Sequence, residues 1–140
     1  ALPIYDAECK MLLNRSGKNP LDSVNCIVSK IEFLEMQSEV QNVFVSDDMA
    51  RYIVSLISAT RRHPLLSRGA SPRATLSLTD MAKAVAFAEG RDYIVPRDVQ
   101  NIFICTVNHR IILNAKASAS KKNSEEILHE ILRKTPKPRT

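Results

Sequence analysis

The chain has 140 residues, a net charge of +5 and 44% hydrophobic residues, which is typical of one globular domain. No apolar run approaches the roughly 18 residues that a membrane-spanning helix needs, so we expect no membrane segment. Only three glycines are present, and they form no Walker A loop. The one Gly-Lys pair, Gly17-Lys18, has Leu12 in place of the first Walker A glycine and Asn19 in place of the Ser or Thr. The chain therefore carries no nucleotide-triphosphate cradle of its own.

The positive charge is concentrated at the C-terminus. Residues 121–140 hold six of the 20 basic residues and three of the 15 acidic residues. The rest of the chain is close to balance, so a basic face that could follow a nucleic-acid backbone is not predicted. We interpret the cations of this tail as solvated, and binding of an acidic partner is the alternative. These cations are Arg133, Lys134, Lys137 and Arg139.

The three cysteines, Cys9, Cys26 and Cys105, are far apart and form no C-x-x-C pair. A tetrahedral metal site needs closely spaced ligands, and a disulfide framework needs an even, dense set, so neither is predicted. Cys9 and Cys105 have apolar neighbours and are expected to be buried thiols. This cysteine usage predicts a reduced, cytoplasmic protein.

Helical periodicity begins near the N-terminus. Residues 6–14 predict a short helix, and a loop over residues 15–20 follows it. Ser29 and Glu32 have the spacing of a capping box, which predicts the start of the next helix.

The strongest helical pattern follows an extended run over residues 43–45. Ser46 is the expected N-cap, with Asp47 and Asp48 in the first turn, where the helix dipole favours carboxylates. An apolar stripe at i, i+3, i+4, i+7 spacing predicts the core-facing side of this helix: Met49, Tyr52, Ile53, Leu56, Ile57 and Thr60.

Another helix is predicted after Gly69, with Ser71 as its N-cap and Pro72 as its first residue. Its many small residues allow neighbouring helices to approach closely. We expect one side of it to be buried: Leu78, Met81, Ala82 and Val85. Gly90 is the expected C-terminal stop.

Residues 93–95 are predicted to be extended, and Pro96 opens a helix whose apolar residues are Val99, Ile102, Phe103, Thr106 and Val107. Residues 111–113 predict a short strand or an apolar helix end, and residues 114–122 a polar break. Asn123 and Glu126 form a second capping box before the last apolar face: Ile127, Leu128, Ile131 and Leu132. The predicted fold class is all-α, a small bundle of four to five helices with at most short extended segments.

The three histidines have no sequence neighbour that marks a catalytic pair or a metal site. His63 ends a helix, where an imidazole can bond free carbonyls, and His129 is expected on a helix surface. We assign a structural role to each of them, His109 included.

Arg73 is an unusual cation, because it lies in the first turn of the helix that begins after Ser71. A cation there opposes the helix dipole, at a cost of about 0.3–1 kcal/mol when it is exposed. An arginine beside the free N–H groups of a helix start makes an anion site, for which phosphate is the natural ligand. The same pattern also fits an arginine that is simply solvated.

Several segments keep a common order and spacing between residues 19 and 138. Residues 59–64 are Ala-Thr-Arg-Arg-His-Pro, residues 69–74 are Gly-Ala-Ser-Pro-Arg-Ala, and residues 90–99 are Gly-Arg-Asp-Tyr-Ile-Val-Pro-Arg-Asp-Val, with His109-Arg110-Ile111 after them. Together they resemble the C-terminal part of MoxR-type AAA+ ATPases. Residues 1–14 resemble the last helix of that family's nucleotide-binding core.

The resemblance implies that residues 1–20 are the end of the core and a linker, and that residues 21–140 are the helical lid. Arg73 matches the family's sensor 2 arginine, which reaches toward the γ-phosphate of ATP held by the core. Ser71, Pro72 and Arg73 are then the expected nucleotide-binding residues. ATP with Mg²⁺ is expected in a longer protein, with no stable binding by this chain alone. The Walker motifs, sensor 1 and the arginine finger would precede Ala1, so we expect the chain to be a piece of that longer protein.

The resemblance further implies a cytoplasmic, chaperone-like ATPase for protein-complex assembly or cofactor insertion. Its expected partners are its own core domain, neighbouring subunits of a homo-oligomeric ring (a hexamer), and a von Willebrand factor A-domain protein. Neither nucleic acid nor membrane is among them. No chemical role follows for Arg61, His109 or Arg110.

Two residues depart from the family pattern. Val95 stands where a capping Thr is usual, so we expect the following helix start to be weaker by about 1 kcal/mol. Arg97 replaces an acidic residue in the same first turn. Two other functions stay open: a helical nucleic-acid-binding module, and a protein-interaction module in which Arg73 contacts a partner carboxylate.

Overall fold

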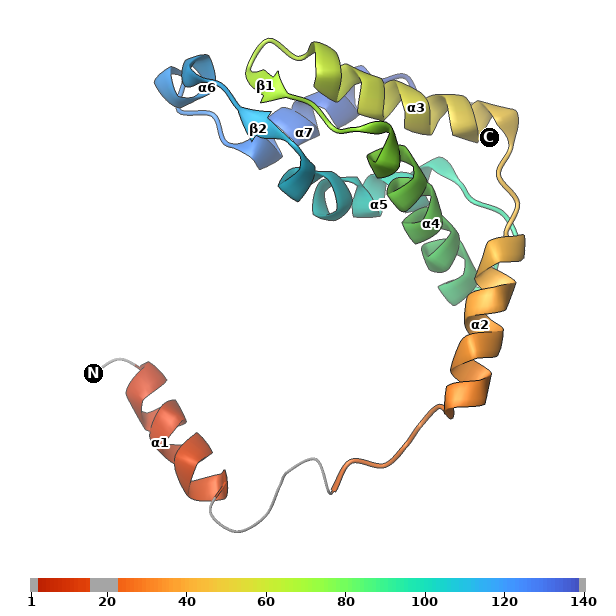
Figure 1. The fold of residues 1–140 in the computed structure, drawn as a ribbon, viewed down its shortest axis with the longest axis vertical. Coiled ribbons are helices and arrows are strands. Elements are labelled where there is room, and N and C mark those ends of the chain that lie inside the picture. The colour runs from red at the N-terminus through yellow and green to blue at the C-terminus, as the bar shows by residue number, and fades with distance from the viewer. Residues whose placement is uncertain (1–2, 16–22, 139–140) are drawn as a thin grey trace. The chain divides into compact units, whose positions relative to one another are not determined.

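The computed structural model describes residues 3–15 and 23–138 (Figure 1). They fall into two compact units, which divide between Leu34 and Glu35. The predicted loop glycine, Gly17, lies outside the described residues.

The first unit contains helix α1 (Pro3–Arg15) and the start of helix α2 (Lys30–Asn42). The capping box predicted at the start of α2 is confirmed. The Ser29 N–H donates to the Glu32 carboxylate over 2.7 Å, and the Glu32 N–H donates to the Ser29 hydroxyl over 3.2 Å. Helix α2 contributes no buried residue.

The second unit contains the rest of the secondary structure in a simple order. Its elements are α3 (Asp47–Arg62), β1 (Leu66–Arg68), α4 (Pro72–Ala88), α5 (Pro96–Val107), the 3₁₀ helix η2 (Asn108–Arg110), β2 (Ile112–Leu113), α6 (Ala115–Ala119) and α7 (Ser124–Lys134). Helix α4 packs against α5 and α3, and α7 packs against α3 and α5 (Figure 1). The strands β1 and β2 pair antiparallel, with Leu66 opposite Leu113. The all-α class is confirmed.

Helix α3 forms the core side that its apolar stripe predicts, because all six stripe residues are buried. Ser46 caps it, since its hydroxyl accepts a hydrogen bond from the Met49 N–H over 3.3 Å. In α5 and α7 the predicted apolar faces are also buried or half-buried. These three faces enclose the core of the second unit.

The predicted burial of Leu78 and Ala82 in helix α4 is confirmed, but the rest of its buried row differs from the prediction. Its buried residues are spaced four apart: Ala74, Leu78, Ala82 and Ala86. Met81 is about half exposed, so its predicted place in the core is wrong, and Val85 is half-buried. The row of small side chains lets α4 lie close to α5 and α3, whereas Met81 at that interface would hold the helices apart.

The predicted extended runs at residues 43–45 and 93–95 lie side by side. Phe44 and Tyr93 form a parallel bridge, in which the Phe44 N–H donates to the Asp92 carbonyl over 2.7 Å. At residues 111–113, the strand alternative is the one observed, as β2. Its partner β1 lies in a segment for which only a loop was expected.

Helix α6 occupies part of the predicted polar break over residues 114–122. Asn114 caps it, because the Asn114 side-chain oxygen accepts a hydrogen bond from the Ala117 N–H over 3.1 Å. At the end of α4, Gly90 has a φ of +73°. The Gly90 N–H donates to Phe87 and the Arg91 N–H donates to Ala86, each over 2.9 Å, which confirms Gly90 as the helix stop.

The prediction of a buried Cys105 is wrong, because its side chain is exposed. The buried face of α5 runs through Val99, Phe103 and Val107, and a residue two positions after Phe103 lies on the opposite side of the helix. Cys26 is exposed and Cys9 is half-buried.

Leu78 and Leu76 provide a matched test of the α4 interface, since Leu78 is fully buried and Leu76 is 67% exposed. We expect Leu78→Ala to lower the free energy of unfolding by about 2–5 kcal/mol, because it removes buried methyl groups and leaves a cavity. Leu76→Ala should stay within about 0.5 kcal/mol of the unsubstituted chain. Urea unfolding of the chain followed by circular dichroism measures both, and equal losses would contradict this orientation of α4.

Candidate functional site

The start of α4 is built as the sequence predicts, except for its cap. Ser71 has the extended backbone of an N-cap, with φ −77° and ψ 167°, and Pro72 takes the first helical position. The Ala74 N–H donates to the Ser71 carbonyl over 2.9 Å. The Ser71 side chain makes no capping hydrogen bond, which corrects the expectation that its hydroxyl closes the helix start. The positive end of the α4 dipole is therefore not covered by a serine cap.

Arg73 stands at this helix start as an exposed cation. It takes part in none of the ion pairs among the described residues, and no acidic residue lies in the first turn of α4. The Arg73 carbonyl accepts a hydrogen bond from the Ser77 hydroxyl over 3.1 Å, within the helix. The charge of Arg73 and the dipole of α4 therefore act together on the same side of the domain, where they favour an anion.

The loop before α4 is held against the last turn of α3. The Thr60 hydroxyl accepts a hydrogen bond from the Ala70 N–H over 2.9 Å and donates one to the Ile57 carbonyl over 2.6 Å. The Arg61 Nε donates to the Ala70 carbonyl over 2.7 Å. Both backbone groups of Ala70 are thus bound by α3 side chains. We call these contacts, together with Gly69, the α3–α4 latch.

A second arginine, Arg91, differs from Arg73 because its guanidinium is paired with carboxylates. Its guanidinium donates to both carboxylate oxygens of the buried Asp98, over 2.8 and 2.7 Å, and also to Glu89 over 2.7 Å. These carboxylate hydrogen bonds raise the pKa of Arg91 above its usual range. Asp98 is only 1% exposed, so the pair is a bidentate ion pair at the base of the loop between α4 and α5.

Asp98 also makes a hydrogen bond at the start of α5, where Val95 has no capping side chain. Its carboxylate accepts a hydrogen bond from the Val95 N–H over 2.8 Å, while the valine side chain offers no acceptor. This role of Asp98 is not among the predictions from the sequence. An acidic residue three positions after an N-cap is the signal that could have found it.

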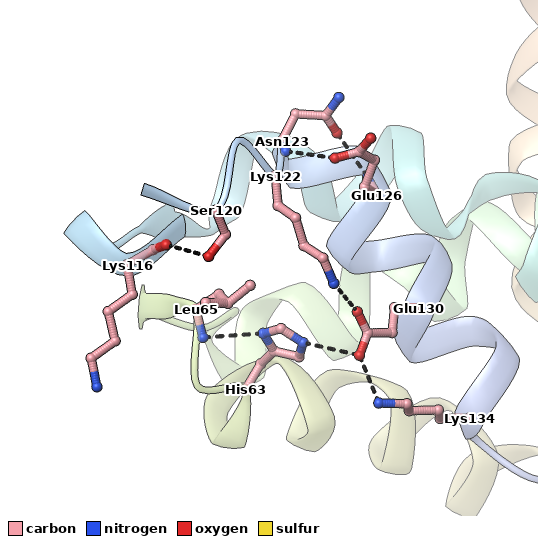
Figure 2. A network of polar contacts seen from close by, with 9 residues as sticks. All are labelled: His63, Leu65, Lys116, Ser120, Lys122, Asn123, Glu126, Glu130 and Lys134. Carbon is pink, nitrogen blue, oxygen red and sulfur yellow. Dashed lines mark hydrogen bonds and ion pairs between the residues drawn. The ribbon is translucent and has the colours of Figure 1, made fainter. Parts of the chain in front are cut away.

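His63 belongs to a network that joins α3 to α7 (Figure 2). The Leu65 N–H donates to His63 Nδ1 over 3.3 Å, and His63 Nε2 lies 3.9 Å from the Glu130 carboxylate. His63 therefore accepts a backbone N–H, and the expected bond to free helix carbonyls is not observed. Burial lowers the pKa of His63, and this effect outweighs the opposing attraction to Glu130.

Glu130 is the centre of that network. It accepts hydrogen bonds from Lys122 over 2.8 Å and from Lys134 over 2.6 Å (Figure 2). These bonds lower the pKa of Glu130 to about 2. Lys134, which the sequence assigns to a solvated tail, is thus paired within α7.

The remaining sequence candidates do not converge on Arg73. The Arg110 Nε donates to the Thr106 carbonyl and to the neighbouring His109 Nε2, each over 3.1 Å. His129 is exposed, as predicted. Among residues 3–15 and 23–138, no group of three or more His, Cys, Asp or Glu is placed to hold a metal ion. In the same residues, no helix is long and apolar enough to cross a membrane.

Comparison with known proteins identifies the class to which this helical domain belongs. Residues 58–131, which include the α3–α4 latch, Arg73, Asp98 and Glu130, match the family model of the AAA lid domain. The chain therefore belongs to the AAA lid domain family.

Within that family, the MoxR-type resemblance is confirmed by named relatives. The chain is 29% identical to Chaperone MoxR1 of Mycobacterium tuberculosis, over 94% of this chain and 37% of that protein. It is 33% identical to the uncharacterized protein YeaC of Bacillus subtilis, over 93% of this chain and 41% of that protein. A crystal structure of a "putative ATPase" from Cytophaga hutchinsonii has a TM-score of 0.80 and 33% identity, over 99% of this chain and 44% of that one. The chain spans about two fifths of the length of these relatives.

The lowered pKa of His63 predicts a pH dependence of stability. In the unfolded chain His63 takes up a proton near pH 6.5, whereas the folded chain takes it up only at lower pH. Its contribution to stability is therefore complete above pH 6.5 and is lost as the pH falls through the folded pKa. We expect the unfolding free energy of His63→Gln to fall less between pH 7.5 and 5.5 than that of the unsubstituted chain.

The carboxylate that faces His63 does not change charge in this range. Glu130 titrates near pH 2 when folded and at 4.5 when unfolded, below the range. His129→Gln, an exposed change on α7, is the matched control. Urea unfolding at both pH values gives the slopes, and an unchanged slope in His63→Gln would refute the assignment.

Proposed function

We propose that this chain is the lid of a longer MoxR-type AAA+ ATPase and that Arg73 is its sensor 2 arginine. The observation that carries the proposal is the state of Arg73, an exposed cation at the start of α4 that takes part in no ion pair among the described residues. In this proposal the lid closes over ATP bound by the core. Arg73 then directs its charge at the γ-phosphate.

The residues at this helix start fit a phosphate group and do not fit a whole nucleotide. Arg73 offers a planar donor that suits phosphate oxygens, while Ser71 and Pro72 shape the turn that presents it. The chain has no Walker A sequence. We therefore assign the binding of the remainder of ATP, and the ligation of Mg²⁺, to a core domain that lies before these residues.

The contribution of this chain to hydrolysis is electrostatic. ATP hydrolysis develops negative charge on the oxygens of the transferred phosphoryl group, and a positioned cation stabilises that charge. Because Arg73 is part of a folded lid, its attraction to the γ-phosphate also links the presence of ATP to the position of the lid. In this proposal residues 1–20 are the end of the core with its linker, and residues 21–140 are the lid.

The assembly and the cellular role are inferred from the same family membership. We propose a cytoplasmic, homo-oligomeric ring, a hexamer, that remodels protein complexes or inserts cofactors with a von Willebrand factor A-domain partner. Two observations support this proposal: one relative is named as a chaperone, and the chain matches the AAA lid domain family.

Arg73 and Arg97 provide a matched pair of variants for the longer protein. Each is exposed and follows a proline at the first helical position, of α4 and of α5 respectively. We expect Arg73→Ala to lower ATP turnover by about 10²-fold, since it removes one donor to a developing charge. Arg97→Ala should leave turnover within about twofold, because surface changes away from a site have small effects. Steady-state phosphate release measures both, and equal turnover of the two variants would refute the sensor role.

The 140-residue chain alone is expected to hydrolyse no ATP, because it lacks the Walker A loop that holds the triphosphate. The same phosphate-release assay on the purified chain, with a heat-treated sample as control, tests this. Turnover above that control would place the active site within these residues.

A further inference from the structure

The α3–α4 latch binds the backbone immediately before Arg73. Thr60 accepts from the Ala70 N–H, Arg61 donates to the Ala70 carbonyl, and Ala70 precedes Arg73 by only three residues. Thr60 and Ala70 are fully buried, so the hydrogen bond between them is sheltered from water. A buried backbone group that loses its partner costs about 1–3 kcal/mol, so the latch strongly favours one position of this loop.

Gly69 makes the latch geometrically possible. A Cβ atom at this position would lie 2.5 Å from the Arg61 Cα and 2.7 Å from the Thr60 carbonyl carbon. Only a residue without a side chain lets the loop backbone lie directly against the last turn of α3. The close approach brings the Ala70 N–H and carbonyl within reach of Thr60 and Arg61.

The connection from Ala70 to Arg73 has little freedom. Pro72 restricts its own φ and disfavours helical backbone at Ser71, which is extended with ψ 167°. The Arg73 backbone then belongs to α4, whose Ala74 is fully buried in the core. The direction in which α4 presents Arg73 is therefore set by where α3 holds Ala70.

We propose that Thr60 and Arg61 are positioning residues for Arg73, which they hold in register with α3. This inference rests on the proposed function, because it concerns how the sensor arginine is aimed at the γ-phosphate. Arg61 uses its Nε for the Ala70 carbonyl, and it makes no ion pair among the described residues. Its role in this proposal is to hold the loop, whereas Arg73 contacts the nucleotide.

A displaced Arg73 has a specific consequence for nucleotide preference. ATP has a γ-phosphate and ADP does not. If Arg73 is displaced and no longer reaches the γ-phosphate, binding of an ATP analogue is weakened and binding of ADP is unchanged. A general loss of stability would weaken both. The informative quantity is therefore the ratio of the two dissociation constants, measured on the longer protein by isothermal titration with ADP and with a non-hydrolysable ATP analogue.

Thr60→Val and Thr60→Ser form the first pair of variants. Valine keeps the shape of the side chain and removes both hydrogen bonds of the hydroxyl, whereas serine keeps the hydroxyl. We expect Thr60→Val to lower the preference for the ATP analogue on the order of 10-fold, the effect of about one lost buried hydrogen bond, and Thr60→Ser to restore it. In an Arg73→Ala background, Thr60→Val should cause no further loss, because the group that it positions is gone.

Arg61→Ala and Arg62→Ala form the second pair. Both residues are exposed in the last turn of α3, so we expect both variants to fold. This pair therefore still tests the proposal if Thr60→Val does not fold. We expect the preference to fall in Arg61→Ala and to stay unchanged in Arg62→Ala, since the side chains that hydrogen-bond to the Ala70 backbone are those of Thr60 and Arg61.

The outcomes separate this inference from the proposed function. If Arg73→Ala lowers the preference while Thr60→Val and Arg61→Ala leave it unchanged, or weaken ADP and analogue equally, the positioning role is overturned and the sensor role stands. If Arg73→Ala itself leaves the preference unchanged, the sensor role fails, and the positioning role fails with it.

Discussion

The second unit depends on one close contact, the packing of the Gly69-Ala70 backbone against the last turn of α3. Thr60 and Arg61 saturate both polar groups of Ala70, and the absence of a side chain at Gly69 permits the approach. From this contact the chain enters α4, whose row of small residues packs against α5 and α3. The contact therefore sets where α4 begins and which way its first turn points.

Arg61, Arg73 and Arg91 have the same side chain but different surroundings in the folded domain. Arg91 is bound by two carboxylates, one of them buried, and organises the loop before α5. Arg61 donates to a backbone carbonyl and holds the loop before α4. Arg73 has no ion-pair partner within the described residues, and its charge stays available at the helix start.

The polar network around Glu130 joins the end of α3 to α7. His63 at the end of α3, Lys122 before α7 and Lys134 in α7 meet at one carboxylate (Figure 2). The pKa values of Glu130 and His63 are both lowered, so the network favours the folded state near neutral pH. It ties α7 to the same end of α3 that carries the latch.

Much of the fold could be predicted because it depends on local rules. The apolar stripe of α3, the capping boxes at Ser29 and Asn123, and the stop at Gly90 all follow from spacings of three or four residues or from one backbone angle. The prediction that Met81 is buried is wrong because α4 is apolar on several sides. Only packing against α5 and α3 selects the row of small residues.

The sequence by itself determined that this is a helical domain and which residue, Arg73, is the unusual cation at a helix start. It could not determine which polar side chains meet, since Thr60 and Ala70, Arg91 and Asp98, and Lys122 and Glu130 are seven to ten residues apart. These separations in sequence exceed one helical turn, so local helix geometry does not bring the groups together and tertiary folding does. Tertiary structure therefore decided that Arg61 is bound to a backbone carbonyl and Arg91 to two carboxylates, whereas Arg73 is exposed and takes part in no ion pair among the described residues.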